Sequence, residues 1–132
     1  MEIMGVSMVE MKVWKWLYEN PEATPAQLKD QTISFAIEVW DKYFAPVLGV
    51  SDSPLLAVYS HMIEVPMYLP NYAYGQIIQF QIEGFIKGKA FSDEIDRMYS
   101  LGRLTPQHWM SKAVGEKISA QPIINALDEA LK

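Results

Sequence analysis

The spacing of apolar residues is the feature that most constrains the fold of this chain. Apolar side chains recur every three to four residues along nearly the whole sequence, which is the period of a helix that buries one face. No segment alternates apolar and polar residues for long enough to predict a half-buried β-strand. The pattern therefore predicts an all-α fold, an irregular bundle of about seven helices. Half of the 132 residues are hydrophobic, so residues 1–132 are expected to form a single helical domain.

Local signals divide the chain into its expected helices. Thr24-Pro25-Ala26-Gln27 is typical of a helix start, with a capping box closed by Gln and Pro at the first helical position. Pro46 should end that helix, because proline cannot continue one. Ser92-Asp93-Glu94 and Thr105-Pro106 predict two later starts. The expected helices run over about 6–19, 25–46, 55–63, 71–87, 93–101 and 106–114, with a last one from Ser119 or Gln121 to the terminus.

Composition excludes several classes of function. The net charge of −5 argues against a nucleic-acid partner, whose phosphates would require clustered Lys and Arg. Cysteine is absent, which excludes disulfides and cysteine-bearing zinc sites and fits a reducing compartment. The apolar opening segment is interrupted by Glu2, Glu10 and Lys12, unlike a membrane span or a signal peptide. We therefore expect a cytoplasmic protein with no membrane partner.

The chain lacks the motifs of a complete active site. Catalytic zinc on a helix needs two His four residues apart with a Glu between them, as in HExxH. The two histidines, His61 and His108, are too far apart in sequence to form this motif. His61 and Glu64 are three residues apart and are better interpreted as a helix-end histidine beside a solvated acid than as half of a metal site. The sequence therefore predicts no metal bound by this chain alone.

A polar stripe stands out on the otherwise apolar helix expected over residues 71–87. Tyr72, Gln76, Gln79 and Glu83 are spaced by four, three and four residues, so they share one face, while isoleucines take the opposite face. This stripe meets water, a partner or a ligand, and composition alone favours water. Four tyrosines near His61 favour a ligand-facing surface instead, because tyrosines at an irregular helix start are good hydrogen-bond donors. They are Tyr59, Tyr68, Tyr72 and Tyr74.

At these residues the chain resembles two related families of gluzincin-type zinc peptidases. His61, Pro66 and Tyr72, followed by Ile77-Ile78-Gln79-Phe80-Gln81, are similar to a late catalytic segment of the angiotensin-converting-enzyme-like carboxydipeptidases. Tyr68-x-Pro70-x-Tyr72-x-Tyr74 is similar to the oligoendopeptidase F and thimet-type oligopeptidases. The similarity covers roughly residues 55–88, and the remainder resembles these families only as a generic helical tail.

The resemblance implies roles for three residues. Tyr72 matches the tyrosine that stabilises the oxyanion formed on the scissile carbonyl, and His61 matches a substrate-binding histidine. Tyr68 is the candidate for a second, substrate-binding tyrosine. HExxH and its downstream Glu are missing. The resemblance therefore implies the C-terminal part of a larger catalytic domain, a hydrolase whose full-length parent carries zinc and cleaves peptides, with this chain inactive alone.

The segment 6–19 supports a second interpretation. Its apolar residues lie on two faces, with Met8, Trp14 and Leu17 on one side and Val9 and Val13 on another. Such a helix is expected to lie between partners, either the missing part of a parent or a second copy of the chain. The alternative function is thus a free-standing helical interaction module that forms a homodimer through its first helix.

Overall fold

The computed structural model describes residues 2–132, and within them the chain is helical with no β-strand. The predicted all-α fold is confirmed. The described residues form eight α-helices and one 3-10 helix, close to the expected number. The chain divides into two compact units, Met1–Ala73 and Tyr74–Lys132. The elements are α1 Glu2–Glu19, α2 Pro25–Tyr43, α3 Ala45–Leu48, η1 Leu55–Ala57, α4 His61–Glu64, α5 Pro70–Ile86, α6 Phe91–Tyr99, α7 Pro106–Ala113 and α8 Gln121–Ala130.

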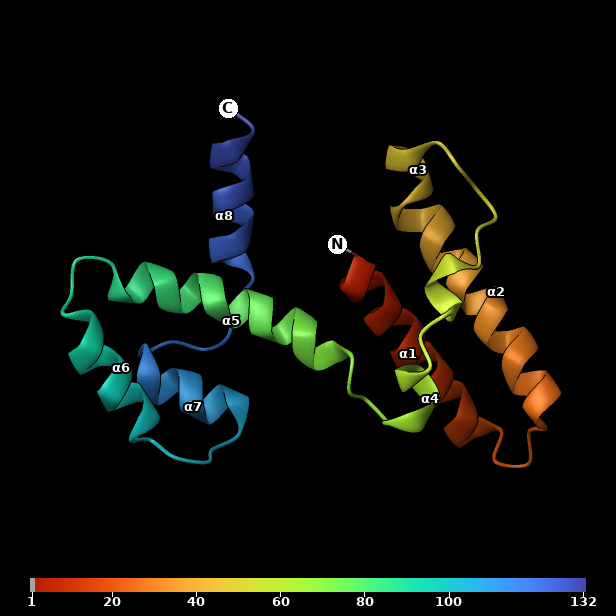
Figure 1. Ribbon diagram of the computed structural model, residues 1–132, viewed down its shortest axis with the longest axis horizontal. Helices are drawn as coiled ribbons and strands as arrows, with labels where there is room; N and C mark the ends of the chain where they lie inside the picture. Colours follow the sequence, from red (N-terminus) through yellow and green to blue (C-terminus); the bar gives the residue numbers. More distant parts are fainter. Residues whose placement is uncertain (1) are drawn as a thin grey trace. The chain divides into compact units, whose positions relative to one another are not determined.

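The first unit is built on α1 packed along α2 (Figure 1). A valine stripe at helical spacing on α1 is fully buried against α2, η1 and α4. Gly5 lets α1 lie close to the ring of Phe44, because a Cβ at this position would be only 2.7 Å from that ring. The core residues of this unit are Val6, Val9, Val13, Ala36, Val39, Trp40, Phe44, Leu56, Met62 and Leu69.

The expected start of α2 is confirmed in detail. The Thr24 hydroxyl accepts the Gln27 amide at 3.3 Å, and the Gln27 side chain accepts the Thr24 amide at 2.9 Å, which completes the capping box. Helix α2 ends at Tyr43, slightly before the end predicted at Pro46. Pro46 instead lies in the first turn of the short helix α3.

The prediction of one continuous helix over residues 55–63 is wrong. The segment forms η1 and α4 instead, separated by residues 58–60. Leu56 and Met62 are each 1% exposed, and both pack in the core beside α1. In one continuous helix these two side chains would point about 120° apart around the axis, so the break allows both to be buried in the same core.

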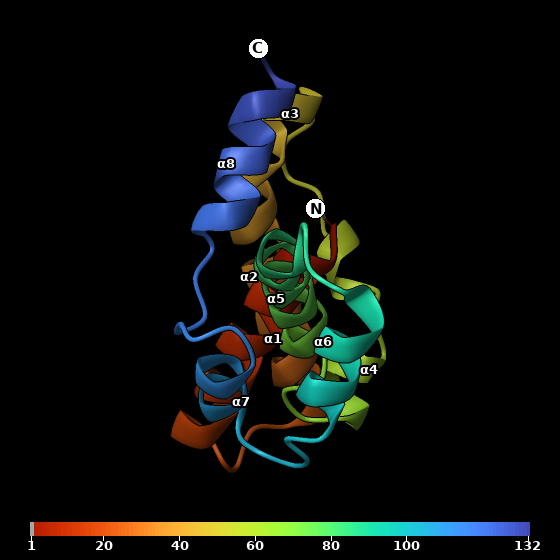
Figure 2. The same cartoon turned by 90° about the vertical axis from the view of Figure 1, so that its left-hand side faces the viewer.

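The second unit packs α6 and α7 together on one side of α5, while α8 extends toward the other side (Figures 1 and 2). Ile78, Ile82 and Phe85 of α5 pack inward, as their spacing predicts. Helix α6 begins two residues before the predicted start, so Ala90, and not Ser92, precedes its first turn. The buried residues of this core are Met98, Met110, Ala113 and Val114.

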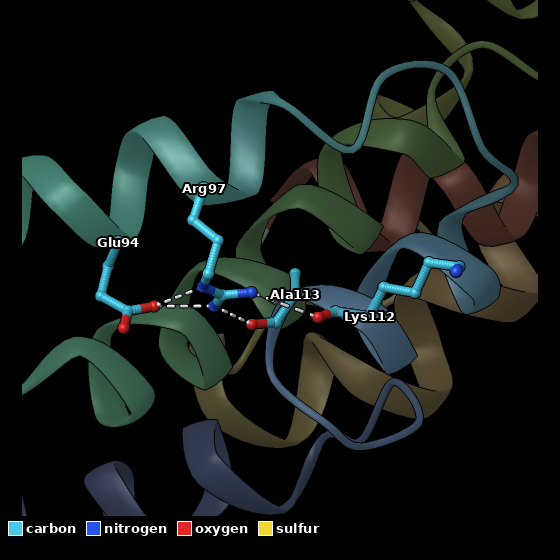
Figure 3. Close-up of polar contacts among 4 residues, drawn as sticks. All are labelled: Glu94, Arg97, Lys112 and Ala113. Atoms are coloured by element: carbon cyan, nitrogen blue, oxygen red, sulfur yellow. Dashed lines mark hydrogen bonds and ion pairs between the residues drawn. The ribbon is translucent and has the colours of Figure 1, made fainter.

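Two polar side chains fix the loops of this second unit. Arg97 donates to the carbonyl oxygens of Lys112 and Ala113 at the end of α7, at 3.3 and 2.5 Å, and pairs with Glu94 at 2.7 Å (Figure 3). A cation placed on the last carbonyls of a helix interacts favourably with the helix dipole. Gln81, 5% exposed, bridges α5 to the Lys117 carbonyl and the Ser119 amide.

Within residues 2–132, no helix combines the length and the apolar character needed to cross a bilayer.

Candidate functional site

The three residues that the sequence assigns to a site lie together in the first unit: His61 on α4, Tyr68 just before α5, and Tyr72 in the first turn of α5. The rings of His61 and Tyr68 are 6.0 Å apart between centroids and inclined by 27°, close to stacked. The rings of Tyr68 and Tyr72 are 5.4 Å apart and perpendicular, a favourable edge-to-face arrangement. We call His61, Tyr68 and Tyr72 the tyrosine cluster.

The two phenols of the tyrosine cluster share a hydrogen bond. Their hydroxyl oxygens are 2.7 Å apart, and either hydroxyl can be the donor. This bond occupies one of the two hydroxyl hydrogens, so the other remains free to donate to an oxygen outside the pair. A donor that itself accepts a hydrogen bond is polarised, which strengthens the bond it makes.

The hydrogen bond between the two phenols, when Tyr72 donates it and so holds its proton, also raises the pKa of Tyr72 above its ordinary value of 10.0, with smaller contributions from desolvation and from the charge of a Tyr68 phenolate. Tyr72 therefore stays protonated at neutral pH and acts as a neutral hydrogen-bond donor.

All three side chains of the tyrosine cluster are exposed, Tyr68 at 37% and Tyr72 at 48% of their surface. A cavity of about 470 Å³ in the same unit lies between α2 and residues 54–63, and its lining includes none of the three. The cluster is thus an open surface that a ligand can approach, and a second wall would be needed to enclose that ligand.

Helix α1 holds the backbone on both sides of this cluster. The Trp14 indole donates to the Met62 carbonyl, next to His61, at 2.8 Å. The Glu10 carboxylate accepts the amides of Tyr68 and Leu69 at 3.0 and 2.9 Å. Glu10 and Trp14 are four residues apart and therefore lie on one face of α1.

Sequence reasoning missed Glu10 as a residue of this site. Its signal was visible, because Glu10 lies four residues after Val6 and three before Val13, inside the buried stripe. A carboxylate at a buried position must find hydrogen-bond donors. The sequence could not indicate which donors these are.

The polar stripe of α5 is exposed along its length, as predicted. Gln79 donates to Glu83 at 2.9 Å, so these two side chains satisfy each other. Beyond Tyr72 the stripe is a solvated surface in which Gln79 and Glu83 pair, and the ligand-facing interpretation stays a prediction.

Metal ligands do not gather in the part of the chain that the structure describes. Over residues 2–132, no three His, Cys, Asp or Glu side chains come close enough together to hold a metal ion.

We expect the purified chain to contain far less than one zinc per molecule, because a stable site needs three or four protein ligands. Metal analysis by mass spectrometry of protein prepared without chelator measures this. One equivalent of zinc that is lost in a His61→Ala variant would contradict the expectation.

Comparison of the chain with protein-family models, curated proteins and solved structures finds no match. The resemblance to zinc peptidases therefore stays a prediction that rests on the residues of the segment 55–88.

Proposed function

We propose that this chain supplies the substrate-side wall of a zinc metallopeptidase of the oligopeptidase type, while another part of the parent enzyme provides the zinc ligands and the general base. One observation carries the proposal. His61, Tyr68 and Tyr72, to which the resemblance assigns substrate and oxyanion contacts, lie in a single exposed cluster with a free phenol donor.

The chemistry of the tyrosine cluster suits a peptide whose scissile carbonyl gains negative charge. A phenol that stays protonated can donate to the oxyanion without itself adding charge to the site. The hydrogen bond between Tyr68 and Tyr72 holds the two phenols together and leaves one hydroxyl hydrogen of the pair for the oxyanion. His61, stacked near Tyr68, presents ring nitrogens that can hydrogen-bond the peptide backbone.

The open position of the tyrosine cluster also supports an incomplete site. Peptidase sites enclose the scissile bond between two walls, and here the cluster forms a surface outside the cavity of the first unit. In the parent, zinc would polarise the scissile carbonyl and lower the pKa of the attacking water. Residues 2–132 hold no set of side chains that fits the ion, so the contribution of this chain is binding and charge stabilisation.

A free-standing module that dimerises through α1 is the second proposal. Met11 and Tyr18 are 44% and 77% exposed on this helix and could form an apolar seam. The valines on the other face of α1 are already buried in the first unit. A dimer interface on α1 would therefore contain fewer apolar residues than the sequence suggests.

His61→Ala tests the substrate contact in the zinc-bearing parent enzyme. KM should rise about tenfold with little change in kcat, because a group that holds the peptide backbone acts equally in the ground and transition states. His108→Ala is the matched control, since His108 is also exposed but contacts Thr105 in the second unit. An unchanged KM in a folded His61→Ala enzyme would remove the binding role, and a lower melting temperature alone would indicate a structural one.

A further inference from the structure

Glu10 of α1 is a fully buried carboxylate that contacts the backbone just before α5. Its side chain is 0% exposed and lies in the valine stripe of α1. Each carboxylate oxygen accepts one backbone amide, Oε1 from Tyr68 and Oε2 from Leu69, at 3.0 and 2.9 Å. Both distances are typical of charge-assisted hydrogen bonds.

A buried carboxylate is costly unless donors replace the water it loses. Over residues 2–132 the ion pairs are Lys12 with Glu38 and Arg97 with Glu94, and neither involves Glu10. The compensation comes from the two amides and from the N-terminal end of α5, which begins at Pro70 and carries the positive pole of the helix dipole. A valine or leucine could fill the same space in the stripe but could not accept these two amides.

The two amides belong to the residues from which the first turn of α5 starts. The carbonyl of Tyr68 accepts the Asn71 amide at 3.2 Å, and the carbonyl of Leu69 accepts the Tyr72 amide at 3.1 Å. The preceding residue, Met67, has φ = 57°, a left-handed conformation that is uncommon for a side chain of its kind. Glu10 thus fixes the backbone between an unfavourable turn and the helix that carries Tyr72.

We propose that Glu10 is a positioning residue for the Tyr68–Tyr72 pair. Its carboxylate holds the backbone of Tyr68 and Leu69 in place, and this placement sets the contact between the two phenols. The consequence for catalysis rests on the proposed function, whereas the geometric role does not.

The test uses Glu10→Gln in the full chain, with Ser7→Ala as the matched control. Gln keeps the size of the side chain but offers one acceptor oxygen, so one of the two amide hydrogen bonds must be lost. Ser7 is also buried on α1, at 3% exposed, but its hydroxyl donates to the Ile3 carbonyl and not to residues 68 or 69. If Glu10→Gln fails to fold, Glu10→Asp provides the same test, because it keeps the charge and withdraws the carboxylate by one methylene.

Two readouts on the chain itself decide the proposal. Hydrogen exchange of the Tyr68 and Leu69 amides should become about 10- to 100-fold faster in Glu10→Gln relative to Ser7→Ala, the effect of losing a hydrogen bond to a charged group. NMR of ring-labelled tyrosine should show the pKa of Tyr72 moving down toward 10.0, because the Tyr68 hydrogen bond that raises it is weakened. Amide exchange and a Tyr72 pKa equal to those of Ser7→Ala in a folded variant would overturn the positioning role.

The catalytic consequence is measured separately. In the zinc-bearing parent, Glu10→Gln should lower kcat more than it raises KM, because the oxyanion donor is misplaced. If the wild-type parent hydrolyses no peptide, the proposed function fails, and the exchange and NMR readouts still decide whether Glu10 positions the tyrosines.

Discussion

Changing Tyr72 to Phe in the zinc-bearing parent enzyme is expected to lower kcat for peptide hydrolysis by about 10²–10³-fold and to leave KM nearly unchanged. The substitution removes one hydroxyl and keeps the ring that packs edge-to-face on Tyr68. The hydroxyl is proposed to act on the oxyanion, which exists only near the transition state, so ground-state binding should be preserved. Steady-state kinetics with a peptide substrate measure both constants.

Tyr74→Phe is the matched control for this substitution. Tyr74 lies on the same helix and is 45% exposed, close to the 48% of Tyr72, and the resemblance gives it no role in catalysis. Its kcat should stay within about twofold of wild type, as for a surface change away from the chemistry. Equal losses in both variants would show that the effect belongs to the helix surface and not to the Tyr72 hydroxyl.

Changing Met62 to Ala should lower the free energy of unfolding of the first unit by about 2–5 kcal/mol, the range for truncating a large buried side chain. Met62 is 1% exposed in the core beneath the tyrosine cluster, and its carbonyl accepts the Trp14 indole. Denaturant unfolding followed by tryptophan fluorescence measures the change, since Trp14, Trp16 and Trp40 lie in this unit.

Met11→Ala removes a methionine of the same size from the exposed side of α1, where 44% of its surface is accessible. This control should change stability by less than about 0.5 kcal/mol. A Met62→Ala variant as stable as Met11→Ala would mean that the packing described for α4 does not form.

Local chemistry made much of the fold predictable from the sequence. The capping box at Thr24 needs only residues three apart, and the isoleucine spacing of α5 needs only one helix face, so both predictions are confirmed. The break between η1 and α4 was not predictable in this way. It arises because Leu56 and Met62 must enter one core, a requirement that only the tertiary structure imposes.

The candidate site was likewise predictable only in part. His61, Tyr68 and Tyr72 lie on a short stretch of chain, so their proximity follows from their order in the sequence. The hydrogen bond from the Tyr68 amide to Glu10 joins residues 58 positions apart, and nothing in the local sequence indicates this pairing. An acid in a valine stripe shows that a buried acceptor exists, and its donors become visible only in the structure, where the backbone of residues 68 and 69 lies against α1.

We propose the tyrosine cluster as one wall of a zinc peptidase site. Its most direct test is a peptidase assay of the protein translated from the complete reading frame that encodes this chain, with zinc removed by chelation and then restored. We expect an HExxH motif upstream of residue 1 and peptide hydrolysis that is lost and regained with zinc. A reading frame without that motif, whose folded product hydrolyses no peptide with or without zinc, would contradict it.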